Sequence, residues 1–94
     1  MDDLPTVELL EAAHTFPGPY LFKAIGRNED GFVARVLAVV REELRFDADP
    51  AHTVRETPAG RHISVTLEVV VSTPHQVIAV YRGLRALAGL VLLL

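Results

Sequence analysis

The sequence feature that most constrains the fold is an alternation of apolar and polar residues over residues 62–71. Apolar residues occupy every second position from Ile63 to Val71, while positions 62, 64, 66 and 68 are polar. Successive side chains of a β-strand point to opposite faces of the sheet, so this segment has one consistently apolar face. The pattern predicts a strand that packs against helices on one side and is open on the other.

An amphipathic helix of about four turns is predicted before this strand. Apolar residues recur at spacings of three and four from residue 32 to residue 44, and the charged residues fall mostly on the other side. Asn28 is a good N-cap, and Glu29 and Asp30 place acids at the positive end of the helix. These local preferences explain residues 28–30 without any ligand.

A second amphipathic helix follows the alternating strand. We expect Ser72 or Thr73 to cap it, Pro74 to occupy its first turn and Gly89 to end it. Further strands are predicted at residues 20–25, at residues 53–57 and at residues 90–94, with a type I turn at residues 57–60 before the alternating strand. A short lead-in helix is predicted over residues 6–13.

The resulting order is strand, helix, strand, strand, helix, strand, which is the split βαβ arrangement called ferredoxin-like. Right-handed crossovers give an α+β fold with a four-stranded antiparallel sheet of order 4-1-3-2 and two helices on one face. We expect a lead-in segment over residues 1–15 and a single domain over residues 16–94. The predicted core comprises Phe22, Val33, Val36, Leu37, Val40, Val65, Leu67, Val69, Val77, Tyr81 and Leu84.

Composition excludes several classes of function. The 94 residues include no cysteine, which removes disulfides, thiolate metal sites and cysteine nucleophiles and fits a cytoplasmic location. The chain has nine basic and twelve acidic residues, so it lacks the excess of positive charge that binding to a phosphate backbone requires, and nucleic acid is not an expected partner. The acidic start at residues 1–3 does not resemble an export signal, and the apolar stretch at residues 84–94 is too short to cross a membrane.

The residues also resemble the YbeD-like family of uncharacterised bacterial proteins. The similarity is collinear over about residues 16–94, and residues 1–15 fall outside it. The segments that carry it are Phe16-Pro17, Phe22 to Gly26, Gly60 to Leu67, the helix containing Gln76, Tyr81 and Leu84, and Val91 to Leu93. The resemblance implies a ferredoxin-like fold similar to the ACT domain, a module that binds amino acids, usually at a subunit interface, and regulates metabolic enzymes.

The resemblance therefore implies a non-catalytic regulatory or interaction domain that binds a metabolite or a partner protein, with no catalytic residues and no cofactor. A homo-oligomer, with a dimer favoured, is expected. The histidines at positions 14, 52, 62 and 75 are dispersed over different elements, so no metal site is predicted.

Two alternatives share this topology. An acylphosphatase-like small hydrolase would need an asparagine where Glu56 stands and a shorter spacing between Gly26 and Arg35, and Glu29 and Asp30 would repel its phosphate. An RNA-binding module would stack bases on aromatic side chains of the open sheet face. The alternating strand instead displays Ser64, Thr66 and Glu68 there.

Two sets of candidate site residues follow. The loop Gly26, Arg27, Asn28, Glu29, Asp30 and Gly31 is the candidate ligand site, and its mixed charges favour a small zwitterionic metabolite. Five successive apolar residues at positions 90–94 cannot all face the helices, so an interface is predicted on the open face or the terminal edge strand. Its candidate residues are Leu21, Ile25, Leu90, Leu92 and Leu94.

Overall fold

The alternating segment forms a central strand of a four-stranded sheet. In the computed structural model, which describes residues 4–94, β3 (His62–Val71) pairs along its length with β1 (Gly18–Arg27). β2 (His52–Glu56) lies outside β3, and β4 (Leu90–Leu93) lies outside β1, with every pair antiparallel. The predicted strand order is confirmed, and it fits a ferredoxin-like arrangement.

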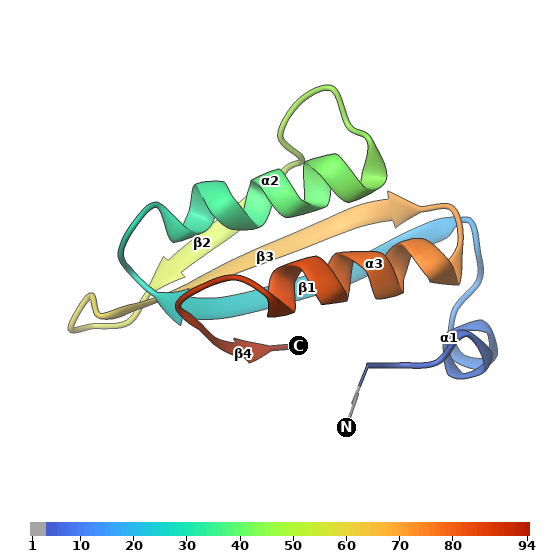
Figure 1. Cartoon of the computed structure of the whole chain (residues 1–94), viewed down its shortest axis with the longest axis horizontal. Helices are drawn as coiled ribbons and strands as arrows, with labels where there is room; N and C mark the ends of the chain where they lie inside the picture. The colour runs from blue at the N-terminus through green and yellow to red at the C-terminus, as the bar shows by residue number, and fades with distance from the viewer. Residues whose placement is uncertain (1–3) are drawn as a thin grey trace.

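The helices α2 (Phe32–Leu44) and α3 (Pro74–Arg85) lie side by side on one face of this sheet (Figure 1). A third helix, α1 (Val7–Ala13), corresponds to the lead-in helix predicted over residues 6–13; it packs against α3 and adds one helix to the two of the predicted ferredoxin-like arrangement. Thr6 caps α1 by accepting a hydrogen bond from the Leu9 amide, and Leu10 is buried in the core. The first three residues of the predicted lead-in segment lie outside the described residues.

Two predicted helix boundaries require correction. The cap at Asn28 is wrong, because α2 begins at Phe32 and its N-cap is Gly31, which has a left-handed φ of 66° and no side chain to cap the helix. The cap at Thr73 is confirmed, since its hydroxyl accepts a hydrogen bond from the Gln76 amide. The predicted end of this helix at Gly89 is wrong, because α3 ends at Arg85 and residues 86–89 turn the chain back to the sheet.

The hydrophobic core lies between the sheet and the α2–α3 layer. Most predicted core residues are buried, whereas Val33 and Tyr81 are only half-buried at its margin. The predicted core list left out several residues that are buried, namely Leu10, Ala24, Phe32, Leu44, Ile63, Val71 and Val80. The core therefore extends under α1 and to both ends of the sheet.

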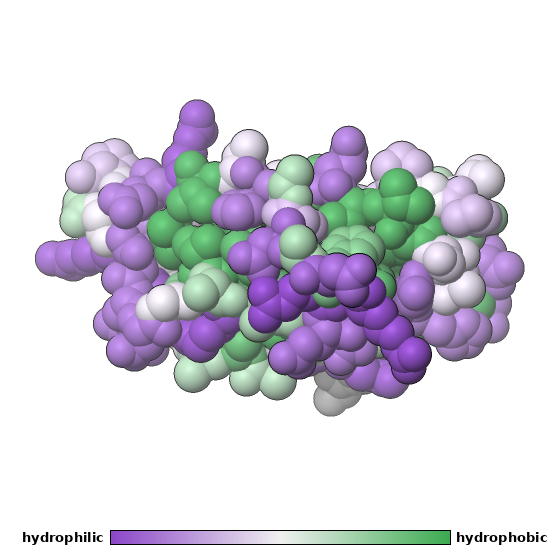
Figure 2. All heavy atoms as spheres, turned by 90° about the horizontal axis from the view of Figure 1, so that it is seen from above, coloured by the Kyte–Doolittle hydropathy of each residue, from purple (hydrophilic) through white to green (hydrophobic). Residues whose placement is uncertain are grey.

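Within residues 4–94, no helix lies on the opposite face of the sheet (Figure 1). Strand β2 is exposed along its whole length, whereas the helices pack against β1, β3 and β4. Seen from above, hydrophobic side chains remain visible between hydrophilic ones on the surface (Figure 2). The exposed face and the loop that joins β1 to α2 are the two places where the predicted sites lie.

Candidate functional site

The loop between β1 and α2 borders an open hollow of about 370 Å³. Three of the six predicted ligand-site residues, Arg27, Glu29 and Asp30, line this hollow. The rest of the lining comes from Arg35 on α2 and from Ala88 and Gly89 in the turn before β4. The hollow therefore joins two loops that are distant in sequence, at one end of the sheet.

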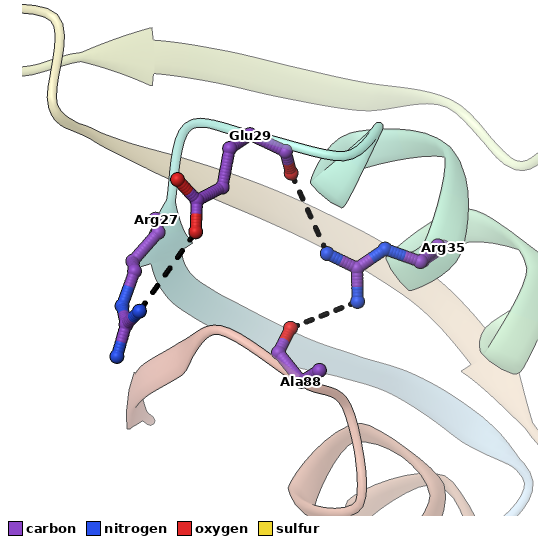
Figure 3. A network of polar contacts seen from close by, with 4 residues as sticks. All are labelled: Arg27, Glu29, Arg35 and Ala88. Atoms are coloured by element: carbon purple, nitrogen blue, oxygen red, sulfur yellow. Dashed lines mark hydrogen bonds and ion pairs between the residues drawn. The ribbon is translucent and has the colours of Figure 1, made fainter.

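Arg27 and Glu29 form a loose ion pair across the rim of the hollow (Figure 3). The Arg27 Nη1 and Glu29 Oε1 atoms are 3.8 Å apart, and the two side chains are 66% and 57% exposed. Exposed pairs of this kind contribute little to stability, so separating them costs little. Both charged groups are therefore available to a ligand.

Arg35 was not among the predicted site residues, yet it holds the two loops together (Figure 3). Its Nη1 donates a hydrogen bond to the Ala88 carbonyl at 2.8 Å, and its Nε donates to the Asp30 carbonyl at 3.0 Å. A longer bond of 3.5 Å joins Nη2 to the Glu29 carbonyl. The guanidinium group thus satisfies backbone carbonyls of both loops.

Gly26 does not line the hollow. It is buried on the helix side of β1, and a Cβ atom added there would meet the Phe32 ring. The absence of a side chain at Gly26 is therefore explained by close packing of Phe32, whereas the sequence had suggested close approach of a ligand.

Asn28 points away from the hollow and fastens the loop to the β2–β3 hairpin. Its Nδ2 donates hydrogen bonds to Glu56 Oε1 at 3.1 Å and to the Gly60 carbonyl at 3.0 Å. This is the structural reason that Asn28 does not cap α2. Gly31, the remaining predicted residue, is exposed at the start of the helix and has open space around it.

A pair of tyrosines lies at the other end of the sheet. The hydroxyl groups of Tyr20 on β1 and Tyr81 on α3 are 3.1 Å apart. Burial raises the pKa of Tyr81 well above its usual range, and the hydrogen bond with Tyr20 adds to the shift. Because the phenol is held neutral, this pair is a packing and hydrogen-bonding element between strand and helix.

The predicted interface residues divide between the two faces of the sheet. Leu21, Leu92 and Leu94 are 55%, 47% and 57% exposed, and Ile25 pairs directly with Leu92 across the β1–β4 ladder. Leu90 instead packs against the hydrophobic core. The register shifts between Ile25 and Gly26, and this irregularity returns Leu90 to the helix side. We define the apolar patch as Leu21, Ile25, Leu92 and Leu94, without Leu90.

The described residues contain neither a metal-binding cluster nor a membrane-spanning helix. Within residues 4–94, no group of three or more histidine, aspartate or glutamate side chains is placed to hold a metal ion. None of the helices in the described part of the chain has the length and apolar character needed to cross a membrane.

The fold and its loops define a small α+β domain with an uncovered antiparallel sheet face. The chain belongs to the family described as Protein of unknown function (DUF493), whose family model matches residues 11–94. This result confirms the resemblance to an uncharacterised YbeD-like family, and the match begins a few residues earlier than residue 16.

Similar proteins come from Shewanella species. A UPF0250 protein of Shewanella sp. strain ANA-3 is 32% identical over 82 residues, which cover 87% of this chain and 86% of that protein. A UPF0250 protein of Shewanella piezotolerans is 33% identical over the same shares of the two chains. A UPF0250 protein of Shewanella amazonensis is 31% identical over 74 residues, which cover 79% of this chain and 82% of that protein.

Proposed function

We propose that the chain is a non-catalytic interaction domain of the cytoplasm that forms a homodimer through the apolar patch on its open sheet face. The observation that carries the proposal is the exposure of Leu21 on β1, Leu92 on β4 and Leu94 directly after β4, on a face that no helix of the described residues covers. Contiguous exposed apolar side chains of this kind mark contact surfaces in soluble proteins. A two-fold axis would place the same patch of each protomer against its copy.

The position of the patch supports this arrangement. β4 is an edge strand, so one row of its backbone groups has no partner strand within the described chain. Leu92 and Leu94 come from this strand or directly follow it, and Leu21 comes from β1. A second copy would cover both the apolar side chains and the strand edge.

Sedimentation velocity of the wild-type protein and a Leu92→Lys variant tests the dimer. We expect dimers at tens of micromolar for the wild type and monomers for the variant, because a buried lysine without a partner opposes association. Leu9→Lys is the matched control, since Leu9 is 64% exposed on α1 and lies outside the patch. A monomeric wild type, or equal dissociation of both variants, contradicts the proposal.

We further propose that the hollow at residues 27–30 binds a small zwitterionic metabolite. Arg27 would pair with a carboxylate of the ligand, and Glu29 and Asp30 would face its ammonium group. Gly89 contributes to the hollow and directly precedes β4, which also carries part of the apolar patch. A ligand that contacts both protomers would favour the dimer by its differential affinity for that state.

Calorimetry with the standard amino acids tests this second proposal. Asp30→Asn and Arg27→Gln remove one ligand-facing charge each, and asparagine tolerates the left-handed φ of 55° at position 30. Asp47→Asn, an exposed aspartate after α2, is the matched control. Binding that survives both loop substitutions, or an absence of binding across the set, contradicts the zwitterion site while leaving the dimer to be judged by sedimentation.

A further inference from the structure

We propose a second ligand site on the open sheet face, over β2 and β3, which binds the phosphate group of a small phosphate monoester that carries an apolar substituent. The proposed site consists of two adjacent hollows on this face. One, of about 300 Å³, is lined by the cations and hydroxyls Lys23, Thr53, Arg55, Ser64 and Thr66, together with Val54. The proposal does not rest on the dimer or on the zwitterion site.

Strand register brings these polar side chains onto one face. Thr66 pairs with Lys23 on one side and with Thr53 on the other, so these three residues form one row across the sheet. Ser64 pairs with Arg55 in the next row. Directly paired residues project to the same side, and the burial pattern of β3 assigns Ser64 and Thr66 to the open side. The hydroxyls therefore lie between the two cations.

The two cations are spaced to converge on one anion. Lys23 and Arg55 are two strands apart and offset by two residues, which places their backbones about 11 to 12 Å apart at ordinary sheet spacings. Two long side chains can close that distance from opposite ends over the hydroxyls of β3. Neither side chain has a hydrogen-bond or ion-pair partner elsewhere in residues 4–94.

The local charge favours an anion in spite of the net charge of -3. No acidic residue lines the polar hollow. The Glu56 carboxylate accepts a hydrogen bond from Asn28, and Glu68 lies beyond Thr66 at the far end of the face. Two fixed cations match the charge of about -2 on a phosphate monoester, and its oxygens accept the several hydrogen bonds that ammonium, guanidinium and hydroxyl groups offer.

The second hollow indicates an apolar substituent on the ligand. Its volume is about 260 Å³, and it shares Lys23, Arg55 and Ser64 with the polar hollow. The remaining lining comes from Ile25, Glu56, Thr57, Pro58 and Ile63; among these, Ile63 is buried with its side chain toward the helices, so Ile25 and Pro58 supply the exposed apolar side chains. Apolar surface beside a small number of convergent polar groups is typical of small-molecule sites. A phosphate over the hydroxyls would leave its ester group against Ile25 and Pro58.

Amide NMR titration at constant ionic strength tests the proposal with inorganic phosphate, phenyl phosphate and benzoate. We expect phenyl phosphate to bind more tightly than inorganic phosphate, benzoate to bind more weakly than either phosphate, and the shifts to centre on residues 23, 55 and 64–66. Lys23→Gln and Arg55→Gln should each weaken both phosphates about tenfold, through loss of a charge-assisted hydrogen bond. Pro58→Ala should weaken phenyl phosphate alone, by about threefold.

Arg82→Gln, on the exposed side of α3, is the matched control for charge removal and should leave binding unchanged. The proposal is overturned if benzoate binds as tightly as phenyl phosphate, or if Arg82→Gln weakens binding as much as Arg55→Gln. It is also overturned if neither phosphate shifts the named amides. Sedimentation of the Arg55→Gln and Pro58→Ala variants separates these outcomes from the dimer, since Arg55 and Pro58 lie outside the apolar patch, whereas Lys23 pairs with Leu94 inside it.

Discussion

Replacing Gly26 with alanine tests whether this glycine serves packing rather than ligand approach. The added Cβ would lie 2.8 Å from Phe32 Cδ1 and closer still to Cε1 and Cζ. Carbon atoms pack at about 3.5 to 4.0 Å, so the ring must withdraw by about 1 Å. Phe32 is 2% exposed, so the ring would have to move against its buried neighbours. Overpacking of this kind costs about 1 to 3 kcal/mol, and we expect Gly26→Ala to lower the free energy of unfolding by that amount.

A double-mutant cycle isolates the contact. Phe32→Leu removes the ring atoms that meet the new Cβ, so Gly26→Ala should cost less than about 0.5 kcal/mol in that background, although Phe32→Leu has a cost of its own. Urea denaturation followed by circular dichroism gives all four free energies. Equal costs of Gly26→Ala in both backgrounds, or no cost in either, would refute the packing explanation.

Further predictions concern the polar contacts at the two ends of the sheet. The folded state raises the pKa of Tyr81, so the contribution of this side chain to the free energy of unfolding is complete below about pH 10 and is lost as the pH rises further. Urea denaturation from pH 8 to 11 should therefore show a decrease in the free energy of unfolding, and Tyr81→Phe should make that decrease smaller. The same decrease in the free energy of unfolding in Tyr81→Phe as in the wild type would contradict the assignment of this pH dependence to Tyr81. Arg35→Met should lower the free energy of unfolding by about 1 to 3 kcal/mol and speed hydrogen exchange at residues 86–90, because it removes the bonds to the Ala88 and Asp30 carbonyls. Arg35→Lys should not restore stability, since one ammonium group cannot make both of the hydrogen bonds that the guanidinium group makes to the two carbonyls. Wild-type stability in Arg35→Lys would contradict the role of Arg35 in joining the two loops. Asn28→Ala should loosen the hairpin tip, with faster exchange at the Gly60 amide and no change at α1.

The order of strands and helices was accessible from the sequence because each central element has a strong local pattern. The alternation in β3 and the three-to-four spacing in α2 both come from burial of one face, and right-handed crossovers between the elements then determine the sheet order. The packing of α1 was not predicted, because its main contribution to the core is the single residue Leu10. A short helix with one buried side chain has almost no periodic signal.

The candidate site was predicted less completely, because three-dimensional contacts override local preference there. Asparagine is a residue type that often caps helices, but the side-chain amide of Asn28 donates its hydrogen bonds to the β2–β3 hairpin, which is distant in sequence. Arg35 has the spacing of an exposed helix residue, and its carbonyl partners become visible only when the turn before β4 is in place. Leu90 was assigned to the interface because strict alternation was assumed, and the irregular register of β4 breaks that alternation.

Isotope-filtered NMR on a mixture of labelled and unlabelled protein shows whether two copies of the chain meet through the apolar patch. We predict intermolecular contacts from the methyl groups of Leu21, Leu92 and Leu94 to the same patch of the partner copy. Contacts confined to the exposed sides of α2 and α3, or no intermolecular contacts at concentrations where sedimentation shows a dimer, would contradict a dimer through this patch.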